Sequence, residues 1–168
     1  MAESPITVAD LMRTDAPVVA RDASIAEVAR VLVEHGLAGV PVVAEGELVG
    51  IVTEADLIAR EADVTVPTVV PFLDALFVAD AGRDFDEEMR RVLAVTAGDL
   101  MSSPVYNIRM SATLSQLATL MIEQRVNPVP VVDETLGLVG LVSRADLVRV
   151  IARLERADTV AGPVVDES

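Results

Sequence analysis

The sequence predicts a mixed α/β (α+β) protein in which two tandem β-α-β-β-α units pack as a pseudo-two-fold module. Two observations support this fold class. The first is an internal repeat: "VADLM" at 8–12 returns as "AGDLM" at 97–101, and "LVGIVTEADL" at 48–57 returns as "LVGLVSRADL" at 138–147. The second is that each copy alternates short apolar runs of strand type with segments of helical periodicity.

The first elements of each copy are a short extended segment and an amphipathic helix. The extended segments are "PVVA" and "PVYNI", and the helices begin at Ser24 and Thr113. Each start has the pattern of a capping box, because Glu27 or Gln116 stands three residues further on. Apolar residues then recur at helical spacing: Ile25, Val28 and Leu32 in the first helix, Leu114, Leu117 and Met121 in the second.

The remaining elements of each copy are two strands joined by a polar turn and then a second helix. "VPVV" is followed by "LVGIV" or "LVGLV", and the second helices begin at Glu54 and Arg144. The strand–helix–strand crossover must be parallel and the turn makes an antiparallel hairpin, so each unit has a small mixed sheet with one helix-covered face. A unit of about 55 residues is marginal alone. We therefore expect the two units to pack together with a symmetric crevice between them.

The repeat divides the chain into four parts. Residues 1–61 form the first repeat with its N-terminal segment, and 97–153 form the second. Between them, 62–96 is an apolar, partly helical insert, and 154–168 is a tail that we expect to fray.

The insert contains all three Phe residues of the chain, which argues against a floppy linker. "PFLDALFV" predicts a helix with Pro71 at its first position. "DFDEEMRRVL" predicts a second helix with an apolar face: Phe85, Met89, Val92 and Leu93. The insert either packs onto the module or a partner subunit, or acts as a regulatory element that senses the crevice.

Composition excludes several classes of protein. The net charge of −14 argues against a nucleic-acid surface, which needs clustered basic residues. The most apolar stretch is interrupted by Pro67 and Pro71 and falls short of the roughly 20 residues of a membrane helix. The N-terminal residues lack the pattern of a signal peptide. With no Cys in the chain, a cytoplasmic location is expected.

The duplicated Thr/Ser-x-x-Asp motif has two interpretations. It can simply cap a helix, and "TVAD" at 7–10 and "TAGD" at 96–99 have the same spacing. The copies at 53–56 and 143–146, however, directly follow an apolar strand. Their side chains then emerge where a sheet edge meets a helix N-terminus, a corner that favours anions. A carboxylate there can also accept hydrogen bonds from two neighbouring hydroxyls, as a ribose diol presents them.

The combined, duplicated pattern resembles paired cystathionine-beta-synthase domains, also called CBS pairs or Bateman modules. The resemblance rests on "DLM", on "AGVPVV" and "NPVPVV", and on the two ten-residue segments above, and it covers about 8–61 and 97–153. It implies the fold described above, a crevice that binds an adenosine-containing ligand such as AMP, ADP, ATP or S-adenosylmethionine, and association of two pairs into a homodimer.

The resemblance also implies which residues form the site. Asp56 and Asp146 would hold the ribose hydroxyls, and Thr53 and Ser143 would contact ribose or phosphate. Backbone and apolar side chains of six further residues would surround the adenine: Gly39, Val40, Pro41, Pro128, Val129 and Pro130.

The two copies differ in the charge beside the motif. Family members that bind phosphate firmly often carry basic residues just before the "PVV" strand, whereas this chain has Ala-Gly in one copy and Asn-Pro in the other. Arg144 follows Ser143, but its counterpart is the acidic Glu54. We therefore expect the second motif to favour a phosphorylated ligand and the first to be weaker or empty.

Two functional hypotheses remain. The first is a stand-alone regulatory sensor that binds an adenosine-type ligand and acts on an unidentified partner protein. The second is a ligand-free structural or interaction module whose motifs only cap helices. We expect no enzymatic activity and no intrinsic metal, because the sequence offers neither a nucleophile–base pair nor a cluster of metal ligands. His35, beside Gly36 at a helix end, fits a capping or solvent-exposed role.

Overall fold

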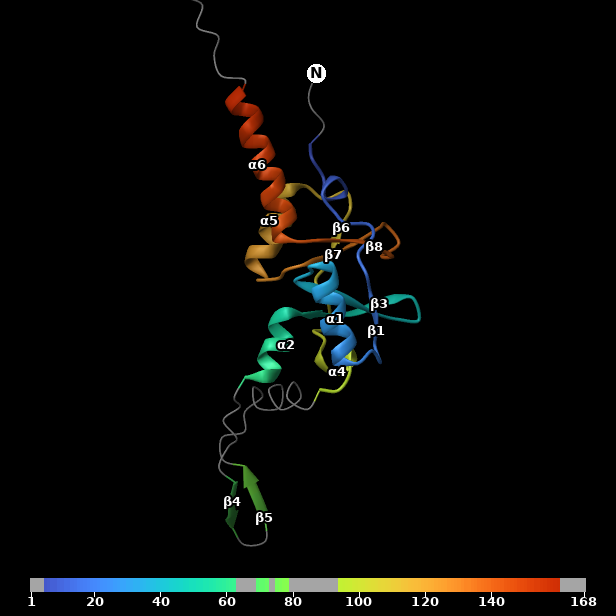
Figure 1. The fold of residues 1–168 in the computed structure, drawn as a ribbon, viewed down its shortest axis with the longest axis vertical. Helices are drawn as coiled ribbons and strands as arrows, with labels where there is room; N and C mark the ends of the chain where they lie inside the picture. The colour runs from blue at the N-terminus through green and yellow to red at the C-terminus, as the bar shows by residue number, and fades with distance from the viewer. Residues whose placement is uncertain (1–4, 63–68, 73–74, 79–93, 161–168) are drawn as a thin grey trace, which may run out of the picture. The chain divides into compact units, whose positions relative to one another are not determined.

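The computed structural model describes residues 5–62, 69–72, 75–78 and 94–160 (Figure 1). The chain forms two compact units. The first-repeat unit is Pro17–Val105, and the second-repeat unit combines Met1–Ala16 with Tyr106–Ser168.

The first-repeat unit contains the predicted series of elements. Its three-stranded sheet has the order β1-β2-β3, with β1 parallel to β2 and β2 antiparallel to β3. The crossover from β1 to β2 passes through α1, and α2 follows β3 directly. The elements are β1 Val19–Ala20, α1 Ile25–His35, β2 Gly39–Ala44, β3 Glu47–Thr53, α2 Glu54–Glu61 and α4 Ala97–Leu100.

The second-repeat unit has the same plan. Its sheet has the order β6-β7-β8, again with one parallel and one antiparallel pair, and α5 and α6 pack on each other. The mixed α/β fold class of each repeat is therefore confirmed. The elements are η1 Val8–Asp10, β6 Ile108–Arg109, α5 Leu114–Glu123, β7 Val129–Val132, β8 Leu138–Val142 and α6 Arg144–Val160.

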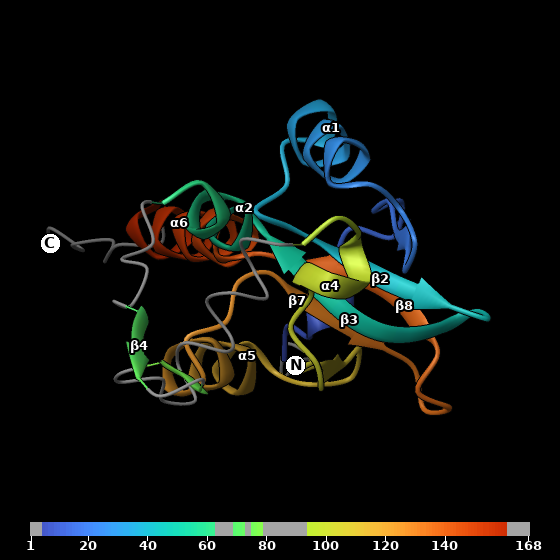
Figure 2. The same cartoon turned by 90° about the horizontal axis from the view of Figure 1, so that it is seen from below.

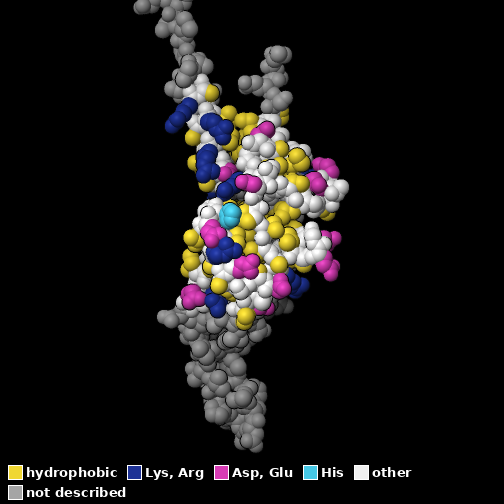
Figure 3. All heavy atoms as spheres, turned by 45° about the vertical axis from the view of Figure 1, so that its right-hand side comes forward, with side chains coloured by type: hydrophobic (Ala, Val, Ile, Leu, Met, Phe, Trp, Pro, Cys, Tyr) yellow, Lys and Arg dark blue, Asp and Glu magenta, His cyan; other side chains and the backbone are white. Residues whose placement is uncertain are grey.

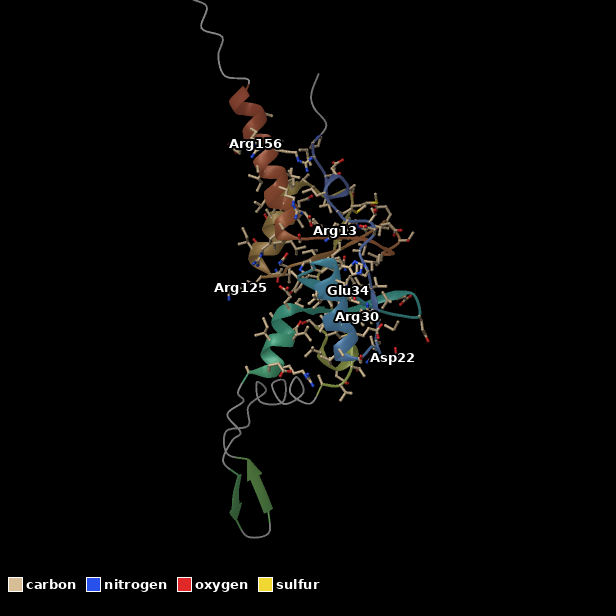
Figure 4. All side chains as sticks on the ribbon, viewed as in Figure 1. Arg13, Asp22, Arg30, Glu34, Arg125 and Arg156 are labelled. Atoms are coloured by element: carbon tan, nitrogen blue, oxygen red, sulfur yellow. The ribbon has the colours of Figure 1, made fainter. Side chains whose placement is uncertain are left out.

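The first helix of each repeat shows how local sequence builds the unit. Ser24 Oγ accepts a hydrogen bond from Glu27 N at 3.2 Å, which fixes the start of α1. The helix ends at Gly36, whose φ of 59° is the left-handed conformation that glycine adopts without strain. Arg30 Nη1 and Glu34 Oε2 pair at 2.7 Å on the exposed side of α1 (Figure 4). The opposite side supplies the core.

The core residues are the ones that the helical spacing predicted. Val28 and Leu32 are buried in α1, and Leu117 and Met121 are buried in α5. Each such side chain contributes about 1.5–3 kcal/mol when it leaves water. The core of the second-repeat unit joins α5 to the sheet and to η1, through Val8, Ile108, Leu117, Met121, Val129, Val131 and Val142.

The segment that leads the first repeat belongs to the second-repeat unit. Val8 N donates to Ala112 O at 2.8 Å, and its side chain is fully buried. Arg13 and Leu141 exchange two backbone hydrogen bonds, Arg13 N to Leu141 O at 2.8 Å and Leu141 N to Arg13 O at 3.0 Å. Residues 8–13 therefore complete the second repeat, not the repeat that follows them in sequence.

The segment that leads the second repeat belongs, in the same way, to the first-repeat unit. Ala97 N donates to Ala23 O at 2.8 Å, and Ser102 and Ile51 exchange hydrogen bonds of 2.9 and 3.2 Å. α4 consequently lies beside β3 (Figure 2). The two repeats exchange their "DLM" segments, so the compact units differ from the boundaries that the sequence repeat suggested.

In each unit, the exchanged "DLM" segment places its methionine against a glycine of the neighbouring strand, β3 or β8. A Cβ added to Gly50 would lie 2.7 Å from Met101 Cγ, and one added to Gly140 would lie 3.0 Å from Met12 Sδ. This contact explains why "DLM" and "LVG" are repeated together: the glycine leaves the space that the methionine fills.

The predicted helix beginning at Pro71 is wrong. β4 Val69–Phe72 pairs antiparallel with β5 Ala75–Val78, with Phe72 opposite Ala75. The segment is rich in Val and Phe, which favour strands, and a proline is tolerated where a strand has only one neighbour. The second helix predicted in the insert, at residues 84–93, lies outside the described residues.

The predicted fraying is wrong for residues 154–160, because α6 continues to Val160 without interruption. Residues 161–168, the rest of the predicted tail, lie outside the described residues. The sequence from 154 to 157, Leu-Glu-Arg-Ala, consists of good helix formers. The next helix breaker along the chain is Gly162. Among the helices that the structure describes, none is long and apolar enough to cross a membrane.

Candidate functional site

The Thr53–Asp56 motif forms a complete capping box at the start of α2. Asp56 Oδ2 accepts hydrogen bonds from Thr53 N and Thr53 Oγ1, both at 2.8 Å. In return, Asp56 N donates to Thr53 Oγ1 at 3.3 Å. The motif therefore satisfies backbone groups at the junction of β3 and α2.

The Ser143–Asp146 motif repeats these bonds at the start of α6. Asp146 Oδ2 accepts from Ser143 N at 2.9 Å and from Ser143 Oγ at 2.7 Å, and Asp146 N donates to Ser143 Oγ at 3.3 Å. The two copies thus have matching cap geometry.

In the other two copies of the motif, on the surface, the aspartate accepts the same two hydrogen bonds from its threonine. Asp10 Oδ2 accepts from Thr7, and Asp99 Oδ2 accepts from Thr96. Hydrogen bonds from the Thr backbone N–H, and then from the Thr hydroxyl, lower the pKa of Asp10 and of Asp99 below the usual value of an aspartate. Capping accordingly explains the spacing of all four motifs.

Burial separates the two candidate copies from the two plain caps. Asp56 is 9% exposed and Asp146 is 8% exposed, whereas Asp10 and Asp99 are exposed. Within residues 5–62 and 94–157, no other polar or charged residue is buried. Burying a carboxylate is costly unless its oxygens are bonded, and a cap uses one oxygen. Capping therefore accounts for one oxygen of each buried carboxylate and leaves the second oxygen for another partner.

The second oxygen differs between the two buried carboxylates. Asp56 Oδ1 has no hydrogen-bond partner in the part of the chain that the structure describes. Asp146 Oδ1 accepts from Arg149 Nη1 at 2.6 Å. The sequence interpretation missed Arg149, although its position three residues after Asp146 is the helical spacing of an ion pair.

The backbone predicted to surround the adenine lies next to each motif. In the sheet of the first repeat, Gly39 pairs with Thr53 and Pro41 pairs with Ile51. In the second, Val129 pairs with Val142 and Pro130 with Leu141. We call Gly39–Pro41, Thr53 and Asp56 the first half-site. The second half-site is 128–130, Ser143, Arg144 and Asp146.

Not every predicted residue offers a side chain to a ligand. Val40 and Val129 are fully buried, and Val129 belongs to the core of its unit. Their side chains face the core, so their share in a half-site is limited to the backbone. Gly39, Pro41, Pro128 and Pro130 are buried as well.

The two half-sites differ in how the first helical N–H is satisfied. Glu54 N donates to the backbone oxygen of Ala38 at 3.0 Å. Arg144 N instead donates to Asn127 Oδ1 at 2.8 Å. The Asn127 side chain thus takes the place of a backbone carbonyl, a role that the sequence interpretation did not assign. The Arg144 side chain itself is exposed.

Three further observations complete the description of the structure. The first-repeat unit has an open depression of about 460 Å³, lined by the ends of β1 and β2, the residues directly after them and the start of α4; the lining includes Arg21, Glu45 and Thr96. No group of three metal-ligating side chains occurs among the described residues. His35 is exposed in the last turn of α1, where it was predicted.

Comparison with known proteins identifies the family. The family description "CBS domain" matches residues 8–63 and 97–153, which is more than half of the chain. The chain belongs to the CBS domain family. The two matched segments are its two repeats, so the chain carries a CBS pair.

Two relatives in sequence span most of this CBS pair. The uncharacterized protein MJ1426 of Methanocaldococcus jannaschii is 27% identical over 142 residues, which cover 80% of this chain and 84% of that protein. The chloroplastic CBS domain-containing protein CBSX2 of Arabidopsis thaliana is 29% identical over 161 residues, which cover 89% of this chain. The match spans 65% of CBSX2, just under two thirds of its length.

CBSX2 is also similar in structure. Its crystal structure in complex with AMP matches this CBS pair with a TM-score of 0.73 and 26% identity, covering 89% of this chain and 99% of the crystallised one.

Proposed function

We propose that this CBS pair is a regulatory module that binds an adenosine-containing ligand, with Asp56 and Asp146 accepting hydrogen bonds from the ribose hydroxyls. The observation that carries the proposal is the burial of these two carboxylates, whose Oδ1 atoms are not used by the cap. A ribose diol offers two donors, and a carboxylate is the acceptor that such a pair fits.

The family relationship supports an adenosine-type ligand. CBSX2, similar in fold over nearly the whole CBS pair, was crystallised with AMP. The chemistry of the half-sites agrees with a nucleoside, because a carboxylate stands at a helix N-terminus beside the buried backbone of a sheet edge. ADP, ATP and S-adenosylmethionine present the same ribose and remain alternatives to AMP.

The second candidate is a ligand-free module in which the motifs only cap helices. Its favouring observation is that each cap is complete without a ligand, and that Arg149 already bonds the free oxygen of Asp146. On this alternative, the chain is a structural or interaction module.

A thermal-shift screen distinguishes the two candidates. A ligand that binds only the folded chain stabilises it by about 2.7 kcal/mol at 100 times its Kd. For a chain of this size, each kcal/mol raises Tm by about 2–4 °C. We expect at least one of AMP, ADP, ATP and S-adenosylmethionine at 1 mM to raise Tm by about 5 °C or more. Guanosine and cytidine nucleotides at the same concentration serve as controls.

The outcome of the screen is decisive in either direction. A shift with adenosine-type ligands alone supports the sensor. Unchanged Tm with all four, with and without Mg²⁺, contradicts it and favours the capping-only module. Equal shifts with every nucleotide indicate an unspecific polyanion effect and also contradict it.

The regulatory output requires a second surface, and we propose a homodimer. Large aliphatic side chains are exposed at equivalent positions of the two repeats: Val33 at 82% and Ile122 at 76%, Ile58 at 70% and Val148 at 62%. Apolar surface that is exposed on one copy of a protein is often covered by a partner, and here it is exposed in both repeats. A second copy of the chain is the partner that carries matching patches.

Charged substitutions in these positions test the homodimer. We expect light scattering after gel filtration to give the mass of two chains for the parent protein and of one chain for the Ile58→Glu, Val148→Glu double variant. Leu136→Glu, an exposed leucine in a turn, is the control and keeps the parent mass. A parent protein with the mass of one chain contradicts the proposal. The regulated partner, a cytoplasmic location and the lack of catalysis stay predictions.

A further inference from the structure

Arg149 contacts the carboxylate of the second half-site. Its Nη1 atom bonds Asp146 Oδ1 at 2.6 Å, while Oδ2 accepts from Ser143. The Asp146 side chain is 10% exposed, but that of Arg149 is 68% exposed. The carboxylate is thus held by its cap, whereas most of the Arg149 side chain is in contact with solvent.

The first half-site has no arginine at the equivalent position, and Arg60, one residue further on, pairs with Glu61. Position 59, which corresponds to Arg149 in the repeat, is Ala. Glu54 corresponds in turn to Arg144. The first half-site therefore combines Asp56 with another acid, whereas Asp146 is accompanied by two arginines.

We propose that Arg149 makes the second half-site selective for phosphorylated adenosine ligands over uncharged ones. This inference rests on the proposed function, because it takes Asp146 as the ribose acceptor. Because Oδ2 is already bonded to Ser143, a ribose diol must donate both of its hydroxyls to Oδ1 of Asp146, which fills both lone pairs of that oxygen and displaces the guanidinium. An uncharged nucleoside offers nothing in return. A nucleotide offers its phosphate, which a guanidinium binds with two parallel hydrogen bonds.

The same ion pair has a simpler explanation that the experiment must exclude. Pairs three residues apart on a helix are common, and exposed ones contribute about 0–1 kcal/mol to stability. If Arg149 only stabilises α6, its removal changes the free energy of unfolding but not the choice between ligands. The ratio of two affinities therefore distinguishes the two roles.

The test measures that ratio at the second half-site alone. Asp56→Asn silences the first half-site, and calorimetric titration with adenosine and with AMP is repeated after adding Arg149→Gln. We expect the ratio of the adenosine Kd to the AMP Kd to fall by about tenfold, corresponding to about 1.4 kcal/mol. The fall combines tighter binding of adenosine with weaker binding of AMP.

A neighbouring arginine supplies the matched control. Basic side chains gather along α6 (Figure 3), and Arg153 is exposed there without an ion pair in the described part of the chain. Arg153→Gln removes the same charge and should leave the ratio unchanged. In the reciprocal experiment, Ala59→Arg with Asp146→Asn should raise the ratio at the first half-site.

Three results overturn the inference. If the ratio of the two Kd values is the same in Arg149→Gln and Arg153→Gln, Arg149 forms only a surface ion pair. The proposed function still stands in that case, provided that the chain binds AMP. An Asp56→Asn variant that binds neither ligand, although the parent protein binds AMP, means that the second half-site is empty. A parent protein that binds no adenosine ligand refutes the proposed function and the inference with it.

Discussion

Replacing Gly140 by alanine is expected to lower the free energy of unfolding by about 2–3 kcal/mol, the upper part of the range for overpacked positions. The new Cβ would lie 2.9 Å from the backbone oxygen of Arg13 and 3.0 Å from Met12 Sδ. The position of the Arg13 oxygen is restrained, because Arg13 and Leu141 are joined by two backbone hydrogen bonds. Urea denaturation of the parent protein and the variant measures the change.

Gly50→Ala provides the matched comparison. The three atoms nearest to its added Cβ all belong to the Met101 side chain, including Cγ at 2.7 Å and Cβ at 2.9 Å. Met101→Gly removes all three atoms, so Gly50→Ala should cost less in the Met101→Gly background than in the parent. Met12→Gly should not rescue Gly140→Ala, because the Arg13 oxygen remains. Equal rescue at both positions contradicts this account of the exchanged segments.

The largest effect on binding is expected from Asp56→Asn and Asp146→Asn. Asparagine keeps one oxygen for the cap, but its other terminal atom becomes a donor that cannot accept from a ribose hydroxyl. Losing a hydrogen bond to a charged acceptor costs about 1.5–3 kcal/mol, so the affinity of an occupied half-site should fall by about 10- to 100-fold. The double variant should not bind AMP at millimolar concentration in calorimetric titration.

Asp10→Asn and Asp99→Asn are the controls for this prediction. Both carboxylates accept the same two threonine hydrogen bonds as Asp56 does but are exposed. We expect the double control variant to bind AMP with the parent affinity. If the control variant loses binding as the Asp56, Asp146 double variant does, the effect comes from helix capping and not from contact with the ligand.

The repeat and its elements could be predicted because their signals are local. Helical spacing placed Val28 and Leu32 in the core, and Thr/Ser-x-x-Asp spacing predicted four caps that all form. The failures of local signals are equally instructive. Pro71 can open a helix or stand in an edge strand, and only the pairing of β4 with β5 decides between the two.

Features that depend on contacts distant in sequence escaped prediction. Nothing near Val8 indicates that it pairs with Ala112, and the exchange of the two leading segments follows from that pairing. The difference between Asp56 and Asp99 is likewise one of burial, which the shared spacing hides. Arg149 stands three residues after Asp146, which is the spacing of a helical ion pair. Many arginines at that spacing point to solvent, however, so the sequence alone could not assign the contact.

A crystal structure of the chain grown with AMP tests the central claim most directly. We predict that the ribose hydroxyls lie within hydrogen-bond distance of Oδ1 of Asp56 or Asp146, with Thr53 or Ser143 still capping its helix. AMP bound elsewhere, for example in the depression beside Arg21 and Thr96, with both carboxylates untouched, contradicts the claim.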